Sequence, residues 1–155
     1  MMDSSVRAEI VTEKIAYIRK MVEAIRTLPL SSYDDFSADA RNAAAAESYL
    51  RRALEALFDL GRHILVKAFA EGVAEYKQIA DGLTQKGVLS TEEGRILREM
   101  AGYRDRMVHF YHEIGKRQLY NLCRDRLVDI QRLSDTFVQW LREHPEKVTG
   151  LKKMK

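Results

Sequence analysis

The sequence has few of the residues that interrupt helices or crosslink chains. Among its 155 residues are two prolines, eight glycines and one cysteine. A single cysteine, Cys123, excludes an internal disulfide and a zinc site built from a cysteine cluster. It lies on an apolar helical register, which favours a buried packing role over a reactive thiol.

Other absences exclude whole classes of protein. No apolar run reaches the roughly 20 residues that a membrane-spanning helix needs, and the opening Met-Met-Asp-Ser-Ser is unlike a secretory signal. The sequence has no glycine-rich phosphate loop, and His63, His112 and His144 lack a spacing with carboxylates that is typical of a metal site. We therefore expect a cytoplasmic protein that needs neither a metal nor another cofactor.

The overall composition is that of a mostly helical globular protein. Hydrophobic residues make up 46% and charged residues 32%, enough for one domain with a substantial core. The net charge of +3 and an isoelectric point near 9.0 permit an anionic partner without requiring one. Between residues 95 and 126 there are eight Lys or Arg and four acids. A solvated helix face is the simplest explanation of that bias.

Helical periodicity organises the first half of the chain. The N-terminal stripe has spacings of four, three, four and three and consists of Val11, Ile15, Ile18, Val22 and Ile25. It predicts a helix ending at Leu28-Pro29, since proline disfavours a helical predecessor. After a polar linker at 31–37, a second helix is predicted from about Ser37 to Glu71-Gly72. Gly61 lies on its apolar stripe. Because glycine costs about 1 kcal/mol there against alanine, we expect another helix to pass close by.

The second half shows the same period with clear boundaries. A shorter helix is predicted near 74–82, and Ser90 with Glu93 forms a capping box that starts another. Gly115 should separate that helix from a last one, near 117–143, which Pro145 stops. The sequence thus predicts an all-α, up-and-down bundle of four to five helices. It should form a single domain, 1–155, with a core at about 5–143 and a basic C-terminal tail at 144–155.

One segment carries more chemistry than the rest: Arg104-Asp-Arg-Met-Val-His109-Phe-Tyr111. A guanidinium can bind a phosphate through two parallel hydrogen bonds, and a neutral imidazole can move a proton near pH 7. Together they suffice to cleave a phosphodiester without a metal. On an ideal helix, however, the two residues stand roughly 140° apart. Either the helix breaks within the motif, or two copies of the chain assemble the site. Taken alone, an arginine and a histidine on a helix are more often structural.

The motif and its surroundings resemble the HEPN superfamily of small helical ribonucleases. The tyrosine two residues after the histidine points to the HepT branch, the toxin half of HepT/MNT toxin–antitoxin pairs. The likeness covers roughly residues 5–143. It extends over Tyr76-Lys77 through Gly87-Val88-Leu89, Met100-Ala-Gly-Tyr103, the motif, and the helix opening with Leu119-Tyr120. HEPN ribonucleases are dimers whose paired motifs face one cleft, so the resemblance implies a homodimer with a composite active site.

The resemblance also implies a role for each residue of the motif. His109 would be the acid/base that helps an RNA 2′-hydroxyl attack the adjacent phosphate, and Arg104 would hold that phosphate and stabilise the transition state. Asp105 would orient the arginine or the histidine. The products would be a 2′,3′-cyclic phosphate and a 5′-hydroxyl. Tyr111 matches the tyrosine that the partner MNT-type nucleotidyltransferase, the antitoxin, modifies with AMP; the added charge would neutralise the site.

Several residues and two other functions stay open. Arg106 and Lys116 are candidates for contacts with RNA phosphates, although a solvated face explains them equally well. We expect His63 to be a satisfied helical histidine, His112 to face solvent, and His144 to be a favourable cation at a helix end. One alternative function is a non-catalytic HEPN module that binds nucleotides or pairs with a nucleotidyltransferase. The other is a helical scaffold whose motif serves dimerisation only.

Overall fold

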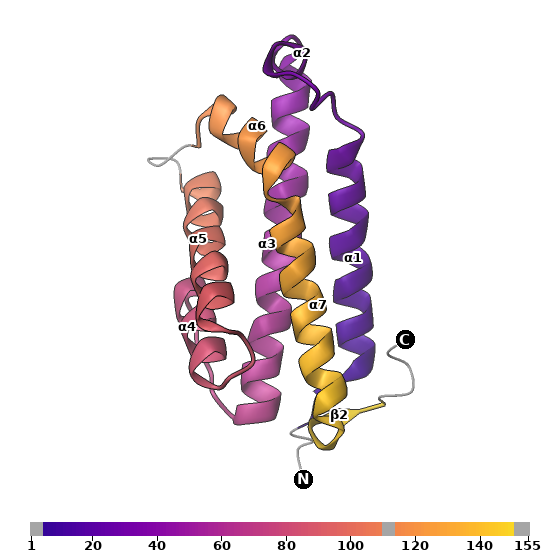
Figure 1. Ribbon diagram of the computed structural model, residues 1–155, viewed down its shortest axis with the longest axis vertical. Coiled ribbons are helices and arrows are strands. Elements are labelled where there is room, and N and C mark those ends of the chain that lie inside the picture. Colours follow the sequence, from indigo (N-terminus) through magenta and orange to yellow (C-terminus); the bar gives the residue numbers. More distant parts are fainter. Residues whose placement is uncertain (1–4, 110–113, 151–155) are drawn as a thin grey trace.

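The computed structural model describes residues 5–109 and 114–150, and it is a bundle of helices (Figure 1). The described residues form seven α-helices: α1 (Ala8–Arg26), α2 (Tyr33–Ser37), α3 (Ala40–Phe69), α4 (Tyr76–Gln85), α5 (Thr91–Val108), α6 (Lys116–Asp125) and α7 (Leu127–Glu143). Two two-residue strands, β1 (Val6–Arg7) and β2 (Val148–Thr149), and a 3-10 turn at Pro145–Lys147 complete the chain. The prediction of an all-α bundle is confirmed.

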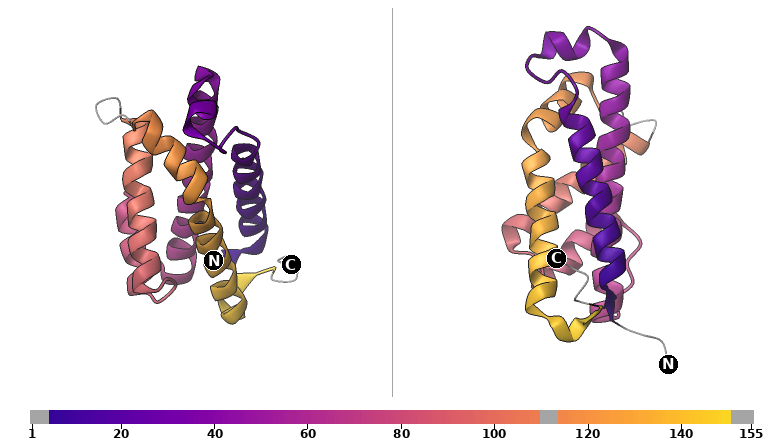
Figure 2. Two further views of the ribbon diagram at one scale, coloured as in Figure 1. Left: turned by 45° about the horizontal axis from the view of Figure 1, so that its top comes forward. Right: turned by 90° about the vertical axis from the view of Figure 1, so that its right-hand side faces the viewer.

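Helix α3 is the central element of the bundle. At 30 residues it is about 45 Å long, and it contacts α1, α4, α5, α6 and α7. Figures 1 and 2 show α1 and α7 running beside it. Its inner stripe, which includes Leu50, Leu54, Leu57 and Ile64, is buried. Burying one such side chain contributes roughly 1.5–3 kcal/mol relative to leaving it exposed, so this stripe holds the bundle together.

Local capping explains where α2 begins and where α3 begins and ends. The side chain of Asp39 accepts a hydrogen bond from the backbone N–H of Arg41 and so starts α3. Ala70 ends α3 in the left-handed region, with φ 54°. The linker predicted at 31–37 contains the short helix α2, because the hydroxyl of Ser32 accepts the N–H of Asp35 at 3.0 Å and Phe36 is buried.

The last predicted helix is broken in two at Arg126, where φ is −111° and ψ is 3°. Each half buries its stripe against a different part of the molecule. Helix α6 packs on α2 and α3, and the hydroxyl of its Tyr120 donates a hydrogen bond to the carbonyl of Leu30 at 3.0 Å. Helix α7 packs on α1, α3 and α5. Because of this bend, one continuous apolar pattern packs against α2 and α3 in its first half and against α1, α3 and α5 in its second half.

Three expectations about single positions are confirmed. A Cβ on Gly61 would lie 2.9 Å from Leu83 Cδ1, so helix α4 does approach α3 closely at this glycine. The capping box of Ser90 and Glu93 is present at the start of α5, with both reciprocal hydrogen bonds at 3.1 Å. Cys123 is buried, and desolvation raises the pKa of its thiol to about 12, which leaves it protonated and inert.

Packing continues beyond the end of α7. We expected residues 144–155 to form a tail, but Val148 pairs in parallel register with Val6. The ammonium of Lys147 donates a hydrogen bond to the carbonyl of Ala68 at the end of α3. The C-terminal segment up to residue 150 is therefore tied to the N-terminal strand. None of the helices in the described ranges is long and apolar enough to cross a membrane.

His63 is a structural histidine, as expected from the sequence. Its Nε2 accepts the backbone N–H of Arg7 at 3.0 Å, which joins α3 to β1. Burial lowers the pKa of His63, and the nearby charges of Lys67 and Arg7 lower it further. The folded protein therefore favours the neutral, accepting imidazole.

This shift predicts a pH-dependent stability. An unfolded histidine titrates at about pH 6.5, and the folded pKa is lower, so the unfolded state binds more protons in the interval between them. The stabilisation that His63 contributes is full above the unfolded pKa of about 6.5. It is lost as the pH falls through the lower, folded pKa of His63. We expect urea midpoints to drop between pH 7.5 and pH 5. The variant His63→Gln should show a flatter slope; an unchanged slope would assign the dependence to other groups.

Candidate active site

The Arg104–His109 motif occupies the C-terminal end of α5. Arg104 lies in the helix, whereas His109 is the first residue after it, with extended dihedral angles of −88° and 118°. The backbone N–H of His109 donates to the carbonyl of Asp105 at 2.9 Å, and its side chain is exposed. The helix therefore ends within the motif, which is one of the two arrangements that the spacing required. Tyr111 and His112 lie outside the described residues.

Arg104 is held on three sides. Its Nη2 donates to Glu55 Oε2 of α3 at 3.1 Å, and its Nη1 donates to Asp105 Oδ1 at 3.4 Å. Its Cζ lies 4.5 Å from the centroid of the Tyr76 ring, a cation–π distance. Only 22% of the Arg104 side chain is exposed. The guanidinium is thus fixed by an acid from α3, an aromatic ring from α4 and its own neighbour in α5.

The supporting groups are themselves anchored in the core. The ring of Tyr76 stacks on that of buried Phe58, with centroids 4.3 Å apart and planes 11° apart. The second oxygen of Glu55 accepts a hydrogen bond from Arg51 at 2.9 Å, and Arg51 also donates to Glu47. Arg104 therefore contacts both the stacked ring of Tyr76 and the last acid in the series of ion pairs Glu47–Arg51–Glu55 along α3.

The electrostatics keep the guanidinium charged. Burial alone would lower the pKa of Arg104, but its hydrogen bond to Glu55 and the neighbouring Tyr76 raise it above its ordinary value. Burial likewise raises the pKa of the Tyr76 hydroxyl. Near neutral pH, Arg104 is therefore a cation beside a neutral phenol.

The arginine still has free hydrogen-bond donors. A guanidinium carries five N–H groups, of which Arg104 uses one for Glu55 and one for Asp105. Its Nε is buried and has no partner among the described residues. One N–H on each Nη remains, and a pair of this kind can bind two oxygens of a phosphate.

Of the other site residues predicted from the sequence, only some lie near Arg104. Asp105 contacts it directly, but no contact between Arg104 and His109 is found within the described part of the chain. The guanidinium of Arg106 lies 5.2 Å from the Tyr103 ring centroid. Lys116 is exposed at the start of α6.

A surface hollow adjoins the motif. Its volume is about 510 Å³, and it is lined by Lys77, Glu99, Gly102, Tyr103, Asp105 and Arg106. Tyr103 and Arg106 of α5 line this hollow together with Asp105, the acid that contacts Arg104. The hollow thus places Asp105 and Arg106 on one accessible surface.

Sequence reasoning missed Glu55 and Tyr76. The i,i+4 spacing of Glu47, Arg51 and Glu55 is visible in the sequence and predicts ion pairs along one helix. Nothing local indicates that Glu55 also reaches an arginine 49 residues further on. Tyr76 fell on an apolar position of its predicted helix, where a core role was the natural interpretation.

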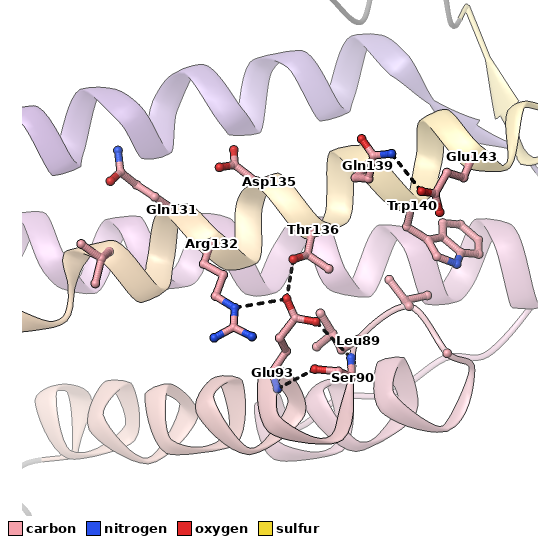
Figure 3. Close-up of a pocket in the computed structure, with 13 residues that line it drawn as sticks. Leu89, Ser90, Glu93, Gln131, Arg132, Asp135, Thr136, Gln139, Trp140 and Glu143 are labelled. Carbon is pink, nitrogen blue, oxygen red and sulfur yellow. Dashed lines mark hydrogen bonds and ion pairs between the residues drawn. The ribbon is translucent and has the colours of Figure 1, made fainter.

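A larger hollow lies elsewhere, between α7 and the start of α5 (Figure 3). It measures about 790 Å³, but its polar side chains bind one another. Glu93 accepts hydrogen bonds from the Ser90 backbone and from the Thr136 hydroxyl. Burial would raise the pKa of Glu93, yet these hydrogen bonds keep it below its usual value. These groups join α5 to α7, so the motif end of α5 is the better candidate for chemistry.

Metal ligands do not gather in the described ranges. No group of three or more His, Cys, Asp or Glu side chains in residues 5–109 and 114–150 is arranged to hold an ion. The side chains that converge at the motif are two carboxylates, a guanidinium and a phenol ring. Within this set, the guanidinium is the group that can bind an anionic ligand.

Comparison with protein families decides the relationship. The family model described as "Ribonuclease HepT-like" matches residues 8–137. The chain belongs to the HepT-like family. The matched stretch begins with α1 and ends inside α7, so it contains Glu55, Tyr76 and the whole motif. No curated protein matches the chain.

Solved structures show the same fold. A tri-AMPylated HEPN toxin of Shewanella oneidensis, in complex with an MNT antitoxin, superposes with a TM-score of 0.75 at 22% identity, over 82% of this chain and 95% of that one. A toxin–antitoxin with AMP-PNP gives 0.73 at 21%, over 83% and 97%. A cytosolic protein of unknown function from Bacillus subtilis, YutE, gives 0.73 at 16%, over 90% and 93%. At these identities the likeness establishes the HEPN-like helical fold.

Proposed function

We propose that this protein is the toxin of a HepT/MNT-type toxin–antitoxin pair and acts as a metal-independent endoribonuclease. The whole chain, 1–155, would act as a single HEPN-like domain. The observation that carries the proposal is the state of Arg104, which is fixed by Glu55, Asp105 and Tyr76 yet keeps a free N–H on each Nη. Five residues later an exposed histidine follows the end of the helix.

The residues suit cleavage by the RNA's own 2′-hydroxyl. Neutral His109 takes the proton of that hydroxyl while its oxygen attacks the adjacent phosphorus, and the bond from phosphorus to the 5′-oxygen breaks. The leaving oxygen takes a proton from an imidazolium, either the same one or His109 of a second copy. Arg104 binds the non-bridging oxygens and stabilises the charge that develops on them. The products are a 2′,3′-cyclic phosphate and a 5′-hydroxyl.

A homodimer is part of the proposal, and the helical glycines support it. A Cβ on Gly61, Gly82 or Gly94 would meet a side chain of the same chain at 3.1 Å or less. On Gly102 it would meet nothing within 4 Å, although this glycine lies in α5 two residues before Arg104. Glycine in a helix interior costs about 1 kcal/mol against alanine. Close approach of a second copy at Gly102 would justify that cost.

The variant Gly102→Leu tests the dimer. Because open space surrounds the position, the monomer should stay folded, while the dimer should lose about 1–3 kcal/mol to overpacking. That loss corresponds to a dissociation constant raised about 10- to 100-fold, measurable by sedimentation at several concentrations. Gly72→Leu is the control, since Gly72 also faces open space but lies in the loop between α3 and α4 and not on α5. A Gly102→Leu dimer as tight as the wild type would remove this face from the interface.

The antitoxin side of the proposal concerns Tyr111. The similar toxin of Shewanella oneidensis is tri-AMPylated and bound to an MNT antitoxin. We propose that a cognate nucleotidyltransferase inactivates this chain in the same way, by transferring AMP to Tyr111. The added phosphate and adenosine would neutralise Arg104 and block the approach of RNA to His109.

One experiment tests toxin and antitoxin together. The protein is expressed alone and together with an MNT-type nucleotidyltransferase, and intact mass and RNA cleavage in EDTA are measured on both samples. The proposal predicts AMP additions on the Tyr111 peptide of the co-expressed sample and cleavage only by the unmodified one. Cleavage that strictly requires added metal would reject the mechanism. An unmodified mass in both samples, with no cleavage by either, would favour the non-catalytic nucleotidyltransferase-partner module.

A further inference from the structure

We propose that Glu55 and Tyr76 are positioning residues for Arg104: they hold the guanidinium in the orientation in which its free N–H groups meet a phosphate. The inference rests on the proposed ribonuclease function, because it assigns to these two residues an effect on the same reaction. It concerns residues outside the Arg104–Tyr111 motif, on two other helices.

Tyr76 restrains the guanidinium from one side. The flat cation lies over the phenol ring at 4.5 Å, and that ring lies over buried Phe58 at 4.3 Å with nearly parallel planes. Tyr76 is also the first residue of α4, so its backbone is set by the start of that helix. Buried Phe58 therefore holds the Tyr76 ring in place, and that ring in turn restrains Arg104.

Glu55 restrains the guanidinium at its Nη2. Its Oε2 accepts one N–H of Arg104 Nη2, while its Oε1 is held by Arg51 at 2.9 Å. The carboxylate is thus anchored at both oxygens, and only 30% of the side chain is exposed. An anchored acid at Nη2 limits the movement of the guanidinium and leaves one N–H on each Nη for a ligand.

No other group in the described residues would replace these contacts. Asp105 is the only other acid paired with Arg104 there, at the longer distance of 3.4 Å, and the Nε has no partner. Without Glu55 or the Tyr76 ring, the long arginine side chain would sample several rotamers. Loss of fixed geometry raises the barrier of the chemical step more than it weakens binding of the ground state.

The experiment uses paired substitutions in the full-length protein. Glu55→Gln removes the charge and keeps the shape; Glu47→Gln is the matched control, because Glu47 also pairs with Arg51 but does not reach Arg104. Tyr76→Leu removes the ring face, and Tyr76→Phe restores it. We expect kcat to fall about 10- to 100-fold in Glu55→Gln and Tyr76→Leu, with KM changed less than about threefold. Glu47→Gln and Tyr76→Phe should stay within about threefold of the wild type in both constants.

A second readout does not depend on cleavage. In protein labelled with 15N at arginine, the Nε–H signal of Arg104, assigned with Arg104→Lys, should be shifted by the Tyr76 ring and exchange slowly because the Nε is buried. Glu55→Gln and Tyr76→Leu should move the signal toward that of an exposed arginine, and Glu47→Gln should not. Circular dichroism confirms that each variant is folded.

The outcomes separate this inference from the proposed function. A wild-type protein that fails to cleave RNA rejects the ribonuclease, while the arginine signal still reports whether Glu55 and Tyr76 hold Arg104. If the wild type cleaves and Glu55→Gln and Tyr76→Leu match Glu47→Gln, the positioning role is wrong and the ribonuclease stands. A rise in KM with an unchanged kcat also overturns the inference, since it would mark the two residues as general binding groups.

Discussion

Replacing His109 by alanine is expected to lower the rate of RNA cleavage by about 10²- to 10⁴-fold, the usual contribution of a positioned acid/base. The fold should not change. His109 follows the last residue of α5 and its side chain is exposed, and substitutions at such positions alter stability by about 0.5 kcal/mol or less. The measurement is single-turnover cleavage in EDTA, with a thermal melt of each variant.

The control for this prediction is His144→Ala, which removes an imidazole far along the chain from the motif. His144 stacks on Trp140 at 4.2 Å and its Nδ1 contacts the Trp140 carbonyl, so this variant should lose some stability and no activity. Cleavage by His109→Ala within about threefold of the wild type would remove the histidine from the mechanism. The reaction would then need another proton carrier, and the HepT-like relationship would persist without the proposed chemistry.

Arg104→Lys separates charge from geometry at the same site. A lysine keeps the positive charge but cannot offer two parallel N–H groups on one plane. We expect a loss of at least about tenfold in kcat from this substitution alone, because two phosphate hydrogen bonds become one. Lysine would also lose the contact between the flat guanidinium and the Tyr76 ring.

The sequence predicted the helices well where one apolar face repeats without interruption. The N-terminal stripe gave α1, and the capping box of Ser90 and Glu93 fixed the first residue of α5. The break at Arg126 was not predicted, because the apolar pattern continues through it and neither glycine nor proline marks it. It arises from packing: α6 follows α2 and α3, whereas α7 follows α1, α3 and α5.

In the candidate site, too, contacts between neighbours in the chain could be predicted from the sequence, whereas contacts between distant residues could not. Arg104 and Asp105 are neighbours in the chain, so their proximity could be foreseen, and the end of the helix at Val108 was one of two stated alternatives. The contribution of Glu55 depends on the register of α3 against α5, which no local spacing encodes. The pairing of β1 with the C-terminal segment is equally non-local. From its basic charge, the segment after residue 143 was predicted to be a tail. Main-chain pairing of β2 with β1 instead gives it a defined structure up to residue 150.

The largest expected effect on stability belongs to Phe137→Ala. The ring is fully buried, and its Cζ lies 3.6 Å from where a Cβ on Gly61 would stand. Phe137 of α7 thus fills the space that the glycine leaves on α3, where Leu83 and Ile79 of α4 also meet. Truncating a buried phenylalanine costs about 3–5 kcal/mol. For a domain of this size that is a large share of the total stability.

Urea unfolding of Phe137→Ala and Val128→Ala provides the test. Val128 lies on the same helix but is 63% exposed, so its truncation should change the free energy of unfolding by about 0.5 kcal/mol or less. Both variants are compared at several protein concentrations, because a dimer that binds only the folded state adds concentration-dependent stability. A loss below about 1 kcal/mol in Phe137→Ala would mean that the bundle collapses into the vacated space. Gly61 would then be explained by its contact with α4 alone, and the packing of α7 would contribute less to the stability of the core.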